Sequence, residues 1–340
     1  MVTEPFKVAI VDRPVPEPGD GDVLIKVKAC GICGSDLHLF RGTHPFRKPP
    51  AILGHELAGE ISAIGRRVTK FKEGDRVTVR PHAECGVCEF CKAGLENLCV
   101  SKTVPGTPEW GGAFAEYFAA PEQAVFRIAD GVSYEAGVLA EPLAVAVHTL
   151  RRISDAPGAG RNSIAILGAG SIGLMCLVVA REYGYKKIFC TDPAPFNRQV
   201  AIEHGAYLAA DPVKEDAVKA VTGANGGGVD AVIVAAGARD IVTQASKMAK
   251  RRGEVCLVAM ITDEIPVYTY GFVYNEQTLT GAMTYQNRDF QEAMDMVNGG
   301  VDLSRFVTQR LPLDETRAGL DMLDRKKGDI VKVLIYPEKY

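Results

Sequence analysis

The sequence lacks the features that mark secreted, membrane and nucleic-acid-binding proteins. Its first residues carry neither a basic leader nor a long apolar stretch, so we expect no signal peptide. Its longest helical apolar segment, 172–180, is far shorter than the roughly 20 residues that a membrane span needs. The 39 Lys and Arg and 42 Asp and Glu residues are interleaved and leave a net charge of -3, which provides no basic stripe for nucleic acid. We therefore expect a cytoplasmic protein whose partner is a small molecule.

Internal repeats and low-complexity tracts are also lacking, and the 340 residues exceed what one hydrophobic core normally organises. Before residue 143, short β-rich segments alternate with Pro and Gly, which is typical of a compact all-β body. After it, strands and helices alternate. Six apolar strands are expected at 163–167, 187–191, 207–209, 229–235, 254–259 and 278–281. Helical crossovers between such strands predict a doubly wound parallel sheet.

A disulfide framework is typical of short secreted chains, whereas the nine cysteines of this 340-residue chain, expected in a reducing compartment, favour metal ligands and a few buried thiols. Four of them follow one another at intervals of two, two and seven residues: Cys85, Cys88, Cys91 and Cys99. Four thiolates close a tetrahedron around one Zn²⁺ and leave no open position, so this site is expected to be structural. Cys30, Cys176, Cys190 and Cys256 lie in apolar runs and are expected to pack as small hydrophobic residues.

A glycine-rich turn lies between the first strand and helix of the predicted sheet, with Gly168, Gly170, Ile172 and Gly173 in a Gly-x-Gly-x-x-Gly element. Such turns also occur simply to reverse a chain. In this context Gly168 allows the tight turn, Gly170 the approach of a pyrophosphate, and Gly173 the packing of helix on strand.

Asp192 ends the next predicted strand, where an acidic side chain accepts hydrogen bonds from the adenosine ribose. Its carboxylate would repel a 2′-phosphate and therefore favours NAD over NADP. A helix N-cap is the alternative role for Asp192. Arg198 leaves the choice of cofactor open, because its guanidinium could receive that phosphate instead.

A second set of metal ligands is dispersed along the chain. Cys33 precedes Ser35, Asp36 and His38, His55 stands beside Glu56, and Glu141 opens an apolar helical segment that contains His148. A thiolate, an imidazole and a carboxylate with one water make an open zinc site, which is the condition for catalysis. Sequence distance alone does not group these residues.

These motifs, in this order, resemble those of the zinc-containing medium-chain dehydrogenases/reductases over nearly the whole chain. The segment that starts at Glu141 is similar to the sorbitol (polyol) dehydrogenase branch. The resemblance implies a GroES-like β-rich catalytic domain formed by residues 1–143 and 283–340, and a Rossmann NAD-binding domain at 144–282. It also implies a homo-oligomer, commonly a tetramer.

The resemblance further implies that Cys33 and His55 bind the catalytic zinc, with Glu56 or Glu141 as the third ligand and the other near the metal water. Glu56 could instead orient its neighbours. Two zinc ions per chain are therefore expected. Asp36 is expected to stabilise the turn after Cys33.

In the expected reaction a secondary alcohol loses its proton through Ser35, with His38 as a candidate continuation of the relay, and passes hydride to NAD⁺. His38 could equally be structural, and His148 is expected to be so.

Two departures from polyol-active relatives, Leu39 in place of Tyr and Thr284-Tyr285 in place of Arg-Tyr, suggest a shorter or less hydroxylated substrate. Phe40 and Trp110 are candidates for one pocket wall, although core packing is their default role.

Two other functions remain open at this point. A threonine-type amino-alcohol dehydrogenase would use the same site on a different substrate. A non-catalytic NAD-binding sensor would use the same scaffold, but it would not need Cys33, Ser35 and His55.

Overall fold

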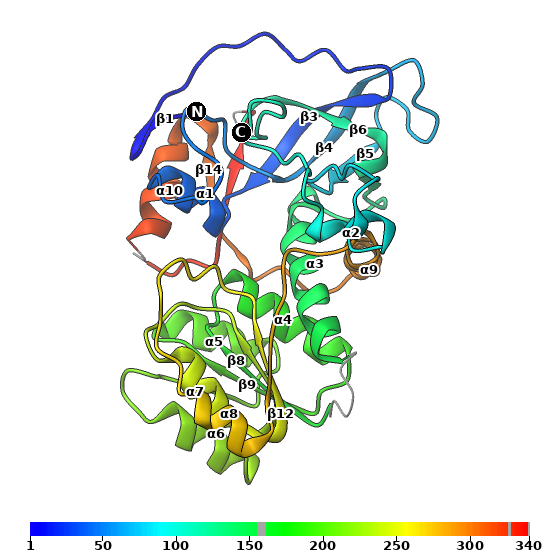
Figure 1. Cartoon of the computed structure of the whole chain (residues 1–340). Helices are drawn as coiled ribbons and strands as arrows, with labels where there is room; N and C mark the ends of the chain where they lie inside the picture. Colours follow the sequence, from blue (N-terminus) through cyan, green and yellow to red (C-terminus); the bar gives the residue numbers. More distant parts are fainter. Residues whose placement is uncertain (155–160, 326–327, 339–340) are drawn as a thin grey trace. The chain divides into compact units, whose positions relative to one another are not determined.

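The computed structural model describes residues 1–154, 161–325 and 328–338 and divides into two compact units. Unit 1 contains Met1–Glu141 and Phe290–Tyr340, and unit 2 contains Pro142–Asp289 (Figure 1). Among the described residues, no helix is both long and apolar enough to cross a membrane. Each unit has its own buried apolar cluster.

Unit 1 is built on a seven-stranded sheet in which the C-terminal segment completes the N-terminal strands. The path of paired strands is β14-β15-β3-β4-β5-β7, with β6 paired to β3. Its strands are β3 (Asp22–Gly31), β4 (Glu56–Ile64), β5 (Arg76–Val79), β6 (Tyr117–Pro121), β7 (Val125–Arg127), β14 (Val307–Pro312) and β15 (Lys332–Tyr336). A separate pair, β1 (Val2–Glu4) and β2 (Lys7–Val8), is antiparallel. Strand β15 runs antiparallel to β3, so residues some 300 positions apart in the chain share one core.

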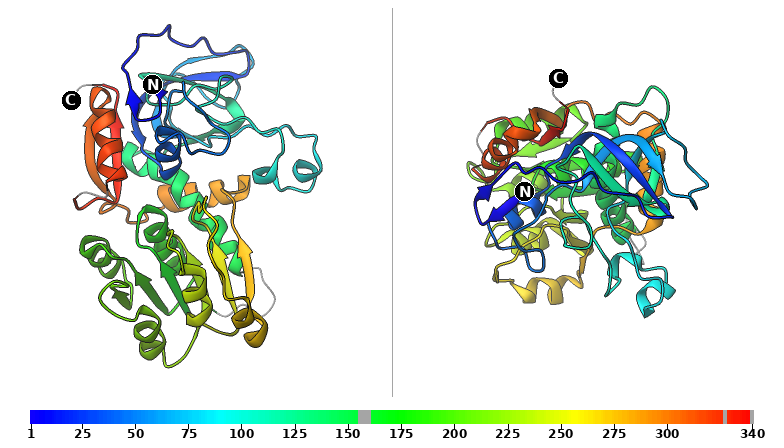
Figure 2. Two further views of the ribbon diagram at one scale, coloured as in Figure 1. Left: turned by 60° about the vertical axis from the view of Figure 1, so that its left-hand side comes forward. Right: turned by 90° about the horizontal axis from the view of Figure 1, so that it is seen from above.

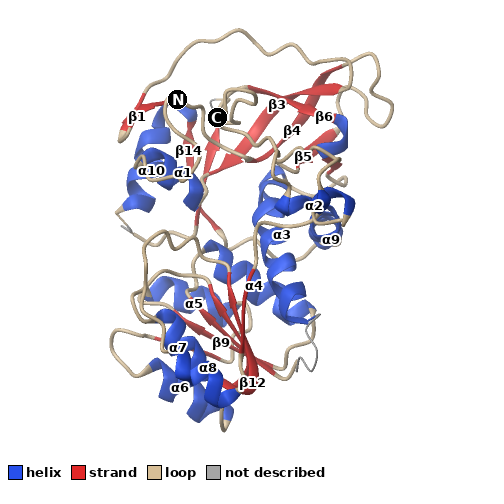
Figure 3. Cartoon of the chain, in the orientation of Figure 1, coloured by secondary structure: helices blue, strands red, loops and turns tan. Residues whose placement is uncertain are grey.

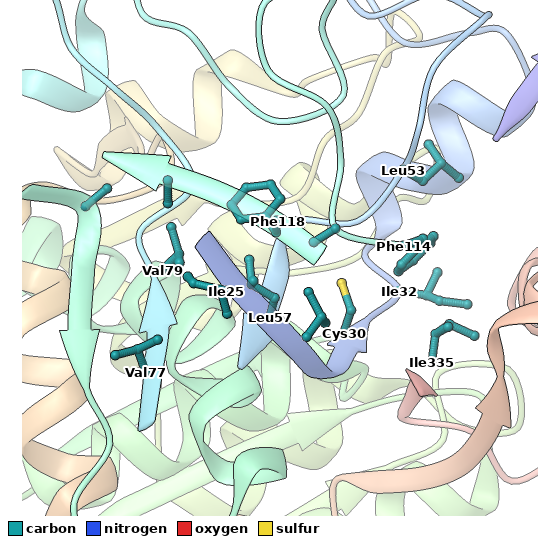
Figure 4. Close-up of a cluster of buried hydrophobic side chains, with 14 of the residues drawn as sticks. Ile25, Cys30, Ile32, Leu53, Leu57, Val77, Val79, Phe114, Phe118 and Ile335 are labelled. Carbon is teal, nitrogen blue, oxygen red and sulfur yellow. The ribbon is translucent and has the colours of Figure 1, made fainter. Parts of the chain in front are cut away.

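Buried apolar residues explain why these strands form one body. Ile25 on β3, Leu57 on β4 and Phe118 on β6 are buried members of one cluster and lie close together (Figure 4). Burial alternates along β6, which directs one face of this strand into the core. The helices of unit 1 are short: α1 (Gly34–Phe40), α2 (Glu89–Lys92) and α10 (Thr316–Asp324).

Unit 2 confirms the predicted doubly wound sheet. Six parallel strands are ordered β10-β9-β8-β11-β12-β13, with helices along the sheet (Figure 3). The strands are β8 (Ser163–Leu167), β9 (Lys187–Thr191), β10 (Leu208–Ala210), β11 (Val229–Val234), β12 (Ala249–Leu257) and β13 (Thr278–Gly281). The helices are α4 (Ser171–Glu182), α5 (Pro195–Glu203), α6 (Ala217–Asn225), α7 (Ile241–Met248) and α8 (Thr269–Asn275). The strand order reverses between β8 and β11, which is where ligands bind in such sheets.

Two helices carry the chain across the boundaries of the units: α3 (Tyr134–Ser154) and α9 (Asn287–Asn298). In unit 2, His148 and Arg151 on α3 both bind Asp289 of α9, with Nδ1 and Nε each 2.7 Å from a carboxylate oxygen. This buried contact gives His148 a structural partner, in line with its expected role.

Candidate active site and cofactor site

Four cysteines lie together in a loop that projects from the β-rich body of unit 1 (Figure 2). The sulfur atoms of Cys88 and Cys91 are 3.5 Å apart, and those of Cys85 and Cys91 are 4.0 Å apart. A tetrahedron with Zn–S bonds of about 2.3 Å has edges of about 3.8 Å, so these separations fit one zinc ion held by four thiolates. The backbone amide of Cys91 helps to lower the pKa of Cys88 to about 6, which favours the thiolate that zinc requires. We call this loop, Cys85–Cys99, the cysteine lobe.

A second group joins Cys33, His55 and Glu56, whose potential ligand atoms all lie within 4.8 Å of one another. Cys33 is the N-cap of α1, whereas Glu56 opens β4 directly after His55. The backbone reaches this arrangement through Gly54, which has φ +91°. A Cβ there would lie 2.8 Å from the backbone nitrogen of Phe114. We call these three residues the open site, and Glu141, which is also buried, does not join the group.

Asp36 contacts Cys33 and faces His55, and so it connects the two segments that form the open site. One of its carboxylate oxygens accepts a hydrogen bond from the backbone nitrogen of Cys33 at 3.0 Å, as expected for a residue that stabilises the turn. The other lies 3.6 Å from Nδ1 of His55, just beyond hydrogen-bonding distance. Burial opposes ionisation of Asp36, but the attraction of His55 and Arg47 lowers its pKa to about 2. Because Asp36 faces Nδ1, the Nε2 atom of His55 is the one available to a metal.

Lys332 is a residue of the site that the motifs did not reveal. Its Nζ lies 2.8 Å from each carboxylate oxygen of Glu56, and both side chains are almost fully buried. Burial alone would lower the pKa of Lys332, but Glu56, with Cys33 and Glu141, raises it instead. The 276 residues that separate Lys332 from Glu56 explain why no local pattern could have found this pair.

Ser35 and His38 stand in successive turns of α1 and are three residues apart, which puts them on one face of the helix. Nδ1 of His38 lies 3.2 Å from the hydroxyl of Thr43, whose side chain is exposed. Burial and Arg41 lower the pKa of His38, which favours the neutral ring. A neutral imidazole next to an exposed hydroxyl can pass a proton towards solvent.

Two candidates for the pocket wall have roles in packing. Phe40 is fully buried in the core of unit 1, with its ring centroid 5.2 Å from that of Phe6, so it has the core role that was its default expectation and is not a residue of a pocket wall. Trp110 stacks on Phe118, and its indole nitrogen donates to the carbonyl of Ala119 at 2.8 Å. Leu39 is also fully buried.

The glycine-rich turn in unit 2 has the geometry of a dinucleotide loop. Gly168 has φ +99°, and a Cβ on Gly173 would lie 1.8 Å from the carbonyl oxygen of Gly168. Gly170, the N-cap of α4, faces open space, which suits a pyrophosphate at a helix N-terminus. Within the part of the chain that is described, the buried hydroxyl of Ser171 has no partner and is a further candidate ligand.

Asp192 follows β9 and keeps acceptor capacity for a ribose. Its two carboxylate oxygens accept from the backbone nitrogens of Ala169 and Ala194, both at 2.8 Å. The N-cap of α5 is Ala194, so the alternative that Asp192 caps this helix is not what the structure contains. Arg198 donates to the carbonyl oxygens of Asp192 and Pro193, and its other terminal nitrogen lies 3.0 Å from Asp211.

Comparison with known proteins assigns the family. Residues 19–130 match the alcohol dehydrogenase GroES-like domain, and residues 171–299 match the zinc-binding dehydrogenase family. A sorbitol dehydrogenase from Bacillus subtilis is 36% identical over 98% of this chain and 95% of its own length. An L-threonine 3-dehydrogenase from Caldanaerobacter subterraneus subsp. tengcongensis is 32% identical over 96% of this chain and 95% of its own.

Among solved structures, 2R,3R-butanediol dehydrogenase from Bacillus subtilis superimposes with a TM-score of 0.89 at 30% identity. The match covers 99% of this chain and 98% of that one. The fold, the two cysteine-containing sites and these relatives agree, and the chain belongs to the zinc-binding, GroES-like alcohol dehydrogenases, the zinc-containing medium-chain dehydrogenase/reductase family.

Proposed function

We propose that this protein oxidises a secondary alcohol to a ketone with NAD⁺, and that the alcohol is a polyol, a sugar alcohol or a vicinal diol. The observation that carries the proposal is the open site, since three different ligands meet at Cys33, His55 and Glu56 and leave a position for substrate. The family relationship supports the same reaction class, as do the sorbitol and 2R,3R-butanediol dehydrogenase activities after which two of the relatives are named.

Cys33, His55 and Glu56 would hold the catalytic zinc, with Glu141 near the remaining position or in exchange with Glu56. When bound, zinc supplies a Lewis acid that favours ionisation of a substrate hydroxyl. Ser35 would accept the hydroxyl proton, and His38 would pass it to Thr43 and solvent. Asp36 would hold His55 in the orientation that presents Nε2.

Residues 144–282 would bind NAD and residues 1–143 with 283–340 would form the catalytic domain. Gly168, Gly170, Ile172 and Gly173 would surround the pyrophosphate, and Asp192 would bind the adenosine ribose. The preference for NAD is supported by Arg198, because its guanidinium is already bound to Asp211 and to two carbonyl groups. Replacement of Asp192 with Ala should narrow the ratio of kcat/KM for NAD over NADP by about tenfold. An unchanged ratio would mean that another group reads the ribose.

The substrate is proposed to be shorter or less hydroxylated than a hexitol. The buried Leu39 supplies no polar group, and Thr284 stands where polyol-active relatives carry Arg. Loss of hydrogen-bonding groups weakens recognition of distal hydroxyls. Butanediol-like diols and short polyols are therefore the first candidates.

The deciding experiment measures NADH formation by zinc-loaded protein with sorbitol, xylitol, 2,3-butanediol, simple secondary alcohols and L-threonine. We expect the highest kcat/KM with a vicinal diol or short polyol. Oxidation of L-threonine alone would assign the amino-alcohol alternative, which the relative with that activity supports. No turnover with any alcohol by protein that holds two zinc ions would favour a non-catalytic NAD-binding protein.

A cytoplasmic homotetramer is proposed as the working state. A reducing compartment is supported by the cysteines, since five of the nine are candidate metal ligands, which must stay reduced. Self-association is supported by exposed apolar side chains around the edge strand β13, among them Tyr270, Val273, Tyr274 and Leu279. Sedimentation equilibrium tests this assembly directly, and a monomer at micromolar concentration would reject it.

A further inference from the structure

The side chain of Lys332 is buried, and its ammonium group is held by hydrogen bonds. It lies at the start of β15 with 3% of its surface exposed, and its ammonium group meets three acceptors. Two are the oxygens of Glu56 at 2.8 Å, and the third is the carbonyl oxygen of Ile32 at 3.3 Å. An ammonium group has three donors, so this set uses all of them and leaves no freedom for the charge to move.

The carboxylate that Lys332 holds is also a member of the open site. The charged groups that act on Lys332 come from three elements: Glu56 on β4, Cys33 at the start of α1, and Glu141 on α3. A buried lysine far from any ligand would be explained as a neutralising partner. A lysine on a candidate metal ligand also changes what that ligand can donate, because a cation draws electron density from the carboxylate.

The balance of charges in the open site shows why a positive charge next to Glu56 is important for binding an anion. A Cys33 thiolate and a Glu56 carboxylate together cancel the two positive charges of one Zn²⁺, and neutral His55 adds none. Negative charge that develops on a substrate oxygen would then have no net positive partner among these groups. Lys332 supplies one further positive charge in direct contact with Glu56.

On the basis of the function proposed above, we infer that Lys332 is a positioning residue that holds Glu56 and offsets its charge, so that the open site stays electropositive towards the substrate oxygen. The role is electrostatic and positional, and Lys332 itself transfers no proton. Lys332 should therefore increase the affinity of the open position for any anion.

The cysteine lobe offers a matched control. Lys102 follows Cys99 and is also partly buried, and the charge of Cys99 acts on its pKa. Its ammonium group bonds the carbonyl oxygen of Asn97 at 2.6 Å and so holds backbone rather than a ligand carboxylate. Lys102→Met therefore removes a lysine beside the other site without touching the open site.

The test uses full-length protein loaded with cobalt, whose visible spectrum reports the ligands of the metal, and azide as the anionic probe. In Lys332→Met the apparent Kd for azide should rise by about tenfold. Lys332→Arg, which keeps the charge and two donors, should restore it, and Lys102→Met should leave it unchanged. An azide Kd in Lys332→Met within about twofold of the parent would overturn the inference.

Alcohol oxidation gives a second readout. In Lys332→Met, kcat/KM at neutral pH should fall by about tenfold to a hundredfold, and its rise with pH should move to higher pH, because the substrate oxygen ionises less readily. Zinc should remain at two per chain. Faster zinc loss with an unmoved pH profile would show that Lys332 is only structural. If Lys332→Met fails to fold, Lys332→Gln, which keeps a neutral N–H donor group but removes the charge, takes its place with the same expectations.

The two proposals fail separately. If the parent protein oxidises no alcohol, the proposed function is wrong, whereas the azide titration still decides whether Lys332 makes the open site electropositive.

Discussion

The cysteine lobe and the open site both place candidate metal ligands together within unit 1, four cysteines in the lobe and one in the open site, but they differ in what surrounds them. The lobe takes all four ligands from fifteen consecutive residues, and its Val87 is 72% exposed. The open site takes its ligands from separate segments and is lined by buried charges, Asp36 and Lys332. The comparison teaches that a cluster of cysteines is enough to indicate a metal site. Buried charged side chains next to the ligands indicate in addition that a reaction takes place there.

The largest expected effect is confined to the open site. Cys33→Ser should reduce kcat to below about a thousandth of the parent value, because a ligand in contact with the reacting centre is lost. Elemental analysis should find one zinc per chain instead of two, and NADH binding measured by fluorescence should persist.

The control is Cys30→Ala, which removes the other cysteine of the same motif, a core residue outside the metal group. It should keep both zinc ions and most of the activity. Retained turnover in Cys33→Ser would erase the distinction between the two sites.

Gly31→Ala tests how tightly the open site is packed. A Cβ at Gly31 would lie 2.1 Å from Oε2 of Glu56, so the carboxylate would have to leave Lys332. We expect the free energy of unfolding to fall by about 1–3 kcal/mol, as for overpacked cores. When kcat/KM is expressed as a free energy, its loss should be larger than this.

Gly34→Ala is the matched control, since a Cβ there meets nothing within 4 Å. Urea unfolding and kcat/KM measure both effects. If the two variants had equal unfolding free energies and equal kcat/KM values, the carboxylate of Glu56 would be free to move.

Cys88→Ser addresses the lobe. We expect loss of one zinc ion and faster proteolytic cleavage within 85–99, because a closed thiolate site holds its loop in place. The kcat per chain that retains the other zinc should stay within about twofold of the parent value.

Val87→Ala, an exposed change in the same loop, should alter neither zinc content nor cleavage. If Cys88→Ser removed activity as completely as Cys33→Ser, the lobe would be part of the chemistry.

The last prediction concerns acid sensitivity near the open site, where the expected effect of a substitution is on the pH dependence of stability rather than on activity or zinc content. Burial and Arg47 lower the pKa of His44 to about 4 from its usual 6.5. The unfolded chain therefore takes up a proton first as the pH falls, and stability is lost between pH 6.5 and about 4, by at most about 1.4 kcal/mol per pH unit.

His44→Asn keeps an acceptor for the backbone nitrogen of Arg47, which lies 3.1 Å from Nδ1, but it cannot titrate. Its unfolding free energy should fall less steeply in this range. His82→Asn gives the same comparison for a histidine that directly precedes the cysteine lobe in the sequence, because burial lowers the pKa of His82 to about 3. An unchanged slope in His44→Asn would rule out His44 as an acid-sensitive group.

The contrast between the sites also explains what sequence could predict. The lobe is local, so its spacing alone predicted the cluster, and the alternating strands and helices of unit 2 predicted the six-stranded parallel sheet. Cys33, His55 and Glu56 come from separate segments, and they could be grouped only because their motifs resembled a family.

Other features lay outside any local pattern. Lys332 belongs to a strand whose pairing with β3 depends on the tertiary fold. The second role of Asp36, facing His55, depends on the path of β4. Helix α8 was missed because Tyr and Val side chains on an exposed surface give no apolar periodicity. The default expectation that Phe40 packs in the core agrees with the structure, where Phe6 and Arg317 lie against its ring.

The contact between Arg198 and Asp211 has a consequence for how cofactor preference could change during evolution or engineering. If Asp192 binds the adenosine ribose as proposed, a single substitution there would remove the repulsion of a 2′-phosphate but would leave the guanidinium of Arg198 bound to Asp211. A second change, such as Asp211→Asn, would weaken the hold on Arg198. If these residues act as proposed, the two changes together should shift the preference towards NADP further than Asp192→Ala alone, because only the pair both removes the carboxylate and frees a guanidinium for the phosphate.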